Sequence, residues 1–149
     1  MQVMADAATK TITIEAPPET CYEIVADFVR YPEWVKDIAE ARILQRDDEG
    51  RPLDVAYTAS ALGRKARYTL RYDYSAAPKS LSWQLIEGDI MRAIDGAYRF
   101  DPSATVAGGT DVTYDLSIEL LIAMPGFLKR RAEARILNSV HHLKSRAEG

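Results

Sequence analysis

The order of the expected elements constrains this chain most. The residue pattern predicts one strand at 9–16, short helices up to about residue 36, an unbroken series of strands over 38–121, and an amphipathic helix at 127–147. A length of 149 residues fits one domain spanning 1–149. A single helix after so many strands must bury its apolar stripe against the sheet. We therefore predict an α+β fold, a curved antiparallel sheet wrapped around its own long C-terminal helix, with a ligand cavity between them.

Alternation of apolar and polar residues identifies the strands. It is clearest at 64–75, where apolar and aromatic side chains fall on one face and most charged ones on the other. Because the turns are short, consecutive strands are expected to pair as a meander of about seven strands. The strands expected besides 9–16 and 64–75 are 38–46, 53–61, 80–87, 90–100 and 110–121.

Two short helices are expected after the first strand. The first runs from Pro18, whose missing N–H costs nothing in a first helical turn, to about Arg30. The second runs from Pro32 to about Lys36, because a proline disfavours helix at the residue before it. Residues 1–8 carry no pattern and are expected to form a loose leader.

Charge and cysteine content argue against several classes of function. The formal net charge of -3 argues against general affinity for nucleic acid. No apolar run approaches the roughly 20 residues that span a bilayer, and the N-terminus lacks a signal-peptide pattern, so a cytoplasmic location is expected. Cys21 is the single cysteine and is interpreted as a small buried side chain. His141 and His142 point about 100° apart on a helix with no further ligand nearby, so we expect no metal site and no cofactor.

Several motifs, taken in order, resemble the START-like (SRPBCC) superfamily. They are Tyr31-Pro32-Glu33-Trp34 after the first helix, the strand with Trp83, and the segments 96–102 and 109–114. More narrowly, the chain is similar to the polyketide cyclase/dehydrase and lipid-transport branch, which includes coenzyme-Q-binding proteins. The resemblance implies a helix-grip fold, as in START and Bet v 1 proteins, with a deep apolar cavity. It does not imply one activity, since members cyclise polyketides, carry lipids or quinones, sense hormones or modulate other proteins.

Five tyrosines on the predicted inward faces are the main candidates for a binding site. A buried hydroxyl left unpaired costs roughly 1–3 kcal/mol, so five are more than a dry core needs, and we interpret them as a cavity wall with hydrogen-bonding tips. Core packing with every hydroxyl partnered is the alternative. Arg92, expected on the face of Ile94 and Tyr98, could bind a ligand carboxylate or phenolate, or else lie in solvent. The predicted ligand-binding residues are Tyr57, Tyr68, Leu70, Tyr72, Trp83, Leu85, Arg92, Ile94, Tyr98, Val112, Tyr114, Leu116, Leu128, Ile136 and Val140.

Three functions follow as hypotheses. The first is binding or transport of a hydrophobic small molecule such as a lipid, a quinone or a polyketide-like compound. The second is a polyketide cyclase/dehydratase-like lyase that acts mainly by positioning its substrate, with Tyr72, Tyr98 and Arg92 as the groups it would supply. The third, implied by the branch that resembles ribosome-associated toxins, is a protein-interaction module that uses its outer face.

The start of the last helix suggests one further partner. The run Lys129-Arg130-Arg131 follows Phe127 and Leu128, and such a combination could make transient contact with an anionic membrane surface. A solvated charge run is the alternative. Both a monomer and a homodimer fit the sequence.

Overall fold

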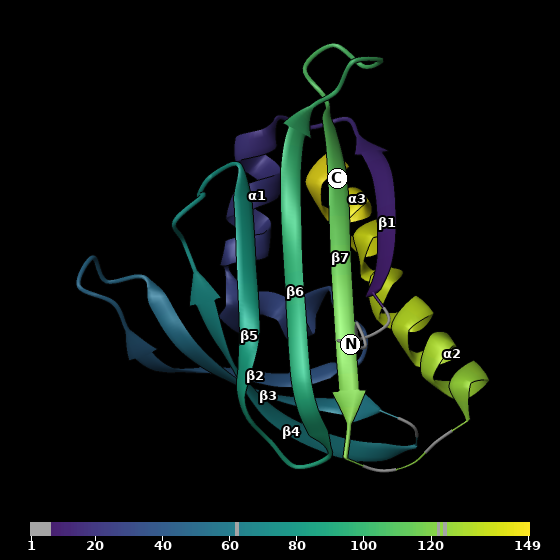
Figure 1. Cartoon of the computed structure of the whole chain (residues 1–149). Helices are drawn as coiled ribbons and strands as arrows, with labels where there is room; N and C mark the ends of the chain where they lie inside the picture. Colours follow the sequence, from purple (N-terminus) through teal and green to yellow (C-terminus); the bar gives the residue numbers. More distant parts are fainter. Residues whose placement is uncertain (1–6, 62, 122, 124) are drawn as a thin grey trace, which may run out of the picture.

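The computed structural model describes residues 7–61, 63–121, 123 and 125–149. Its seven strands are β1 (Ala7–Ile14), β2 (Ile38–Arg46), β3 (Pro52–Ala61), β4 (Arg64–Asp73), β5 (Ser80–Gly88), β6 (Met91–Pro102) and β7 (Thr110–Leu120). They form one antiparallel sheet in the order β1-β7-β6-β5-β4-β3-β2, so β2 to β7 make a meander and β1 pairs with β7 (Figure 1). Each expected strand is present, with ends shifted by no more than two residues.

The sheet is curved, and the helices lie on its concave side (Figure 1). Part of the curvature comes from bulges, which bend a strand locally. Register shifts occur between β2 and β3, at Thr69/Leu70 between β4 and β5, and at Met91/Ala93 between β6 and β7. The predicted helix-grip fold is confirmed.

Two short helices follow β1, but the expected boundaries were wrong. These two helices are α1 (Pro18–Ala26) and the 3-10 helix η1 (Phe28–Glu33). Two further helices, α2 (Gly126–Leu137) and α3 (Ser139–Glu148), come after β7. Helix α1 therefore ends before Arg30, and η1 begins before Pro32. Three residues per turn in η1 place Phe28 and Tyr31 on one side, and both side chains are buried. In the part of the chain that the structure describes, no helix is long and apolar enough to cross a membrane.

The expected continuous helix at 127–147 is divided at Asn138. Asn138 keeps a right-handed helical backbone, with φ −63° and ψ −12°. Its side-chain oxygen accepts a hydrogen bond of 3.0 Å from Lys10 Nζ on β1. Asparagine and the serine that follows it are weak helix formers, so the break falls at a locally weak point.

The buried line of the C-terminal helices differs from the predicted stripe. α2 contacts β1 and β7, and α3 contacts β1 and α1. Glu133, Leu137 and Val140 are buried, whereas Ile136 is 36% exposed and Leu128 is half-buried. Ile136 precedes Leu137 by one residue and so points about 100° away from it. Of the predicted apolar stripe, Leu137, Val140 and Leu143 are therefore buried, whereas Leu128 and Ile136 lie beside the face of α2 that packs on the sheet.

β1 begins at Ala7, so the end of the expected leader at 1–8 is strand. Residues 1–6 lie outside the described residues. Because alternate residues of a strand share a face, the polar residues of β1 meet those of β7 on the outer side of the sheet. Three side-chain hydrogen bonds join them: Thr9 to Asp115, Thr11 with Thr113, and Thr13 to Asp111.

Candidate functional site

The concave face of the sheet, called here the inner face, carries the five predicted tyrosines. Tyr57 on β3, Tyr72 on β4, Tyr98 on β6 and Tyr114 on β7 are buried. Tyr68 on β4 is half-buried. Their positions follow from the period of two, which sends alternate side chains to the same face.

The aromatic rings of the inner face form a continuous layer. Tyr57 and Tyr68 are stacked with their centroids 5.4 Å apart, and Tyr98 and Tyr114 are stacked at 4.3 Å. Trp83 on β5 lies 5.7 Å from both Tyr98 and Tyr72. Because the hydroxyl of Tyr72 pairs with that of Tyr57, Trp83 and Tyr72 together join the two halves. Such offset and tilted arrangements are favourable beyond the area they bury.

Two hydrogen bonds satisfy part of the polar atoms in this layer. The hydroxyls of Tyr57 and Tyr72 are 2.6 Å apart in a buried pair. The hydroxyl of Tyr98 lies 3.4 Å from Ser139 Oγ at the start of α3. The hydroxyls of Tyr57, Tyr72 and Tyr98 therefore each have a partner within the protein. Ser139 was not among the predicted site residues.

The hydroxyls of Tyr68 and Tyr114 differ from the others. Neither hydrogen-bonds another residue within the described ranges. Burial raises the pKa of both phenols, because water no longer stabilises the phenolate. Both groups are therefore neutral near neutral pH, and each can donate one hydrogen bond and accept others.

Gly96 on β6 allows the indole of Trp83 to lie against the backbone. The two residues pair across β5 and β6. A Cβ atom at Gly96 would overlap the indole ring of Trp83. A glycine inside a strand often marks such a close approach, and here it makes room for the central ring of the inner face.

η1 adds two rings that the sequence analysis did not assign to the site. Phe28 stacks on Tyr72 with centroids 3.9 Å apart, and Tyr31 stacks on Tyr57 at 5.9 Å. The hydroxyl of Tyr31 donates to the carbonyl oxygen of Val25. The three-residue spacing of Phe28 and Tyr31 was the available signal, because it matches a 3-10 turn.

The predicted apolar residues fall into two groups. Trp83 and five others are buried: Leu70, Ile94, Val112, Leu116 and Val140. Leu85 on β5 and Leu128 on α2 are half-buried, and Ile136 on α2 is exposed. The second group, with Tyr68, lies at the edges of the core rather than within it.

The structure corrects the expectation for Arg92. Met91 pairs with Leu120 and Ala93 pairs with Glu119, so Arg92 is the extra residue of a bulge. The bulge shifts the alternation at the start of β6, so Met91 is buried and Arg92 is exposed. Arg92 is thus in solvent and does not join the inner face.

No catalytic constellation is evident among the described residues of the inner face. Tyr72 and Tyr98 are buried there, but Arg92, the third group of the lyase hypothesis, is not. Cys21 is buried, and burial raises the pKa of its thiol, which makes it a poor nucleophile. The described residues hold no cluster of three or more metal-binding side chains.

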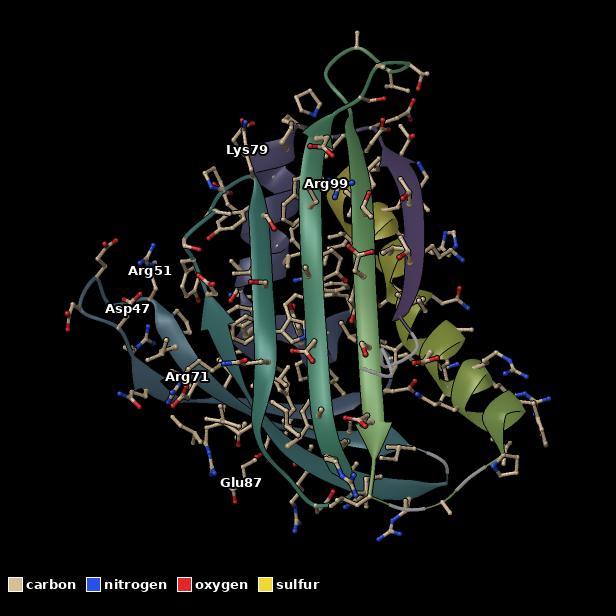
Figure 2. The ribbon with its side chains drawn as sticks, in the orientation of Figure 1. Asp47, Arg51, Arg71, Lys79, Glu87 and Arg99 are labelled. Atoms are coloured by element: carbon tan, nitrogen blue, oxygen red, sulfur yellow. The ribbon has the colours of Figure 1, made fainter. Side chains whose placement is uncertain are left out.

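An open hollow of about 770 Å³ lies along β3 to β6, and no residue of α2 or α3 lines it. Its charged side chains largely pair with each other or with their neighbours, and Figure 2 shows three of them at this side of the sheet. Arg71 donates to both oxygens of Asp54, at 2.8 and 2.9 Å. Arg51 donates to Asp47 and lies 4.6 Å from the ring centre of Tyr74. The lining of this hollow mixes charged and apolar residues and includes Tyr72, Trp83 and Gly96, so the hollow adjoins the residues of the inner face.

Comparison with known proteins decides the family. Residues 14–141 match the sequence profile of the family described as polyketide cyclase / dehydrase and lipid transport. The chain belongs to this family. Membership in this START-like family, together with the fold, supports a role in binding a hydrophobic ligand.

Solved structures show the same fold. A START superfamily protein from Mycobacterium smegmatis is 25% identical, with a TM-score of 0.87 over 95% of this chain and 97% of that one. The Zhui aromatase/cyclase from Streptomyces sp. R1128 is 18% identical, with a TM-score of 0.79 over 97% and 94%. A protein from Thermus thermophilus is 22% identical, with a TM-score of 0.77 over 96% and 94%. No curated protein sequence matches this chain significantly.

Proposed function

We propose that this chain binds a hydrophobic small molecule between the inner face and α2. The observation that carries the proposal is incomplete burial on both sides. Tyr68 and Leu85 on the sheet, and Leu128 and Ile136 on α2, stay partly exposed although the centre of the same sheet face is buried. Removing water from large apolar side chains lowers the free energy of the system. A ligand between these two surfaces would exclude that water.

The polar atoms at this position suggest what the ligand carries. The hydroxyls of Tyr68 and Tyr114 are neutral and have no described partner, so they are available as donors. A neutral phenol donates readily to a carbonyl oxygen. A lipid, quinone or polyketide-like molecule with an apolar or aromatic body and one or two carbonyl or hydroxyl oxygens fits this chemistry.

Binding or transport is favoured over catalysis. A general acid or base must reach the reacting atom, and the groups of the lyase hypothesis do not converge. The aromatase/cyclase from Streptomyces shares 18% of its residues with this chain, a level at which the likeness extends to the fold alone. The inner face offers shape and hydrogen-bonding tips, which are sufficient for a carrier.

The proposal is tested by titration with the fluorescent probe 1-anilinonaphthalene-8-sulfonate. We expect saturable binding to the wild-type chain. Ile136→Glu should weaken this binding by about tenfold or more, because the new carboxylate would have to lose water beside the apolar probe.

Ala134→Glu is the matched control. Ala134 is exposed on the same helix, and it lies about 200° around the axis from Ile136. The same charge is therefore introduced away from the proposed site, and binding should be unchanged. Equal binding by the wild type and both variants, with far-UV circular dichroism showing that all are folded, would overturn the proposal.

A further inference from the structure

Six cations and two large apolar side chains gather at one end of the molecule. We call this surface the basic end. It consists of Arg64, Lys65, Arg92, Lys129, Arg130, Arg131, Leu121 and Phe127.

Topology brings these residues together from four parts of the chain. The start of β4, the β5–β6 turn, the end of β7 and the start of α2 all lie at the lower end in Figure 1. The backbone N–H of Leu121 donates to the carbonyl oxygen of Ile90, which fixes the end of β7 beside the β5–β6 turn. Asp89 of the same turn hydrogen-bonds the backbone of Arg67 on β4.

The cations of the basic end are not neutralised by ion pairs. None of the six forms a salt bridge with another residue in the described ranges. Elsewhere most exposed arginines are paired, for example Arg135 with Asp37 and Arg146 with Glu33. Four acids lie nearby among the residues that the structure describes: Glu87, Asp89 and Glu119 in the neighbouring strand ends, and Glu133 one turn further along α2. They are fewer than the six cations. This end is therefore positive, although the formal net charge of the chain is -3.

The apolar residues of the basic end are unusually open. Phe127, at the start of α2, is 56% exposed, and Leu121, at the end of β7, is 52% exposed. The run 129–131 places three cations in the first turns of α2, where the helix dipole disfavours positive charge. Neither feature improves the packing or the electrostatics of the folded chain by itself.

We propose that the basic end is a docking surface for an anionic lipid bilayer. Such a bilayer attracts lysine and arginine by its surface potential and also accepts exposed phenylalanine and leucine side chains at the acyl boundary. A nucleic acid offers phosphates but no comparable apolar layer, which leaves Phe127 without a partner. The asymmetry of charge orients the molecule, because the acidic remainder of the chain is repelled by the same surface.

The docking surface lies close to the proposed ligand site. Tyr68 pairs with Gly88 beside the β5–β6 turn, and Leu128 follows Phe127 in α2. Docking would thus bring the partly exposed edge of the inner face to the membrane, where a hydrophobic ligand can be exchanged. The proposal goes beyond ligand binding, since docking needs no ligand in the site.

Co-sedimentation with vesicles tests the proposal. One set contains phosphatidylcholine alone and the other contains phosphatidylcholine mixed with phosphatidylglycerol. We expect the wild-type chain to bind only the mixed vesicles, and less tightly as salt is added. The triple variant Lys129→Gln, Arg130→Gln, Arg131→Gln should lose on the order of 100-fold in partitioning. Phe127→Ser should lose on the order of tenfold.

The matched control removes the same charges elsewhere. Arg42→Gln, Arg46→Gln and Lys79→Gln replace two arginines and one lysine that form no salt bridge within the described ranges. Lys79 lies at the opposite end of the molecule from Glu87 (Figure 2). This variant should sediment with mixed vesicles as the wild type does. An equal loss in both triple variants, no wild-type binding to mixed vesicles, or full binding by Phe127→Ser would each overturn the proposal.

Probe binding separates this proposal from the ligand-binding one. The triple variant at 129–131 should bind the uncharged apolar probe N-phenyl-1-naphthylamine as the wild type does, which also shows that it is folded. Ile136→Glu should lose probe binding yet still sediment with mixed vesicles. If the triple variant lost both vesicle binding and probe binding, the docking surface would not be separate from the ligand site, and the proposal would be overturned.

Discussion

The close approach of Trp83 to Gly96 predicts that the smallest possible substitution, Gly96→Ala, destabilises the fold. The added methyl group would overlap the indole ring. The backbone at Gly96 cannot retreat, because it pairs with Trp83 on one side and with Leu116 on the other. The indole cannot move freely either, since the rings of Tyr98 and Tyr114 lie 5.7 and 5.8 Å from it.

The cost should therefore fall at the upper end of the range for overpacked cores, about 3 kcal/mol in the free energy of unfolding. For a domain of this size, that corresponds to a fall in Tm of about 6–12 °C. Urea unfolding followed by tryptophan fluorescence measures the change. Trp83→Phe removes the overlapping part of the indole, so Gly96→Ala should cost much less in that background.

Gly126→Ala is the matched control. A Cβ atom there meets only the flexible end of Arg130, 3.2 Å away. Alanine is also a better helix former than glycine, so the substitution should leave stability unchanged or raise it by up to about 1 kcal/mol. If Gly96→Ala were as stable as the wild type, or cost the same in the Trp83→Phe background, the steric argument would be refuted.

Further predictions concern the buried hydroxyls, pH and the exposed arginine. Tyr57→Phe should cost about 1–3 kcal/mol in urea unfolding by leaving the hydroxyl of Tyr72 unpaired, and adding Tyr72→Phe should cost little more; additive losses would argue against the pair. Hydrogen bonds from the Arg135 guanidinium lower the pKa of Asp37, so this contact stabilises the fold above the carboxyl's unfolded pKa and is lost as the pH falls through the lowered value. Arg135→Gln should accordingly be less stable than the wild type at neutral pH but equally stable in strong acid, and a difference that persisted in acid would contradict this. Arg92→Gln should leave probe binding unchanged and reduce vesicle binding; a loss of probe binding would place Arg92 in the ligand site after all.

Strand positions and the inner face could be predicted because one periodicity controls both. Alternation in β4 places Ala66, Tyr68, Leu70 and Tyr72 on the same side wherever the strand lies in the sheet. The inward position of the tyrosines follows from local pattern alone. Which hydroxyls pair does not, because Tyr57 and Tyr72 meet only through the register and curvature of the folded sheet.

The errors arose where local pattern and tertiary structure conflict. Arg92 is an even number of residues from Ile94 and Tyr98, so alternation places all three on one face of the strand. A bulge before Ala93 interrupts the alternation, and the sequence pattern alone gives no sign of that bulge. The apolar spacing of the last helix suggested a single buried stripe through Ile136. Contacts of α2 with β1 and β7 instead select the neighbouring face.

Native mass spectrometry of the purified chain tests the central claim most directly. The claim is that the partly exposed surfaces of the inner face and α2 hold a hydrophobic molecule. We predict a complex between the wild-type chain and a hydrophobic compound, either co-purified or the added 1-anilinonaphthalene-8-sulfonate, that denaturation releases and that Ile136→Glu forms weakly. A wild-type chain that shows only its own mass, with and without the probe, would contradict the account.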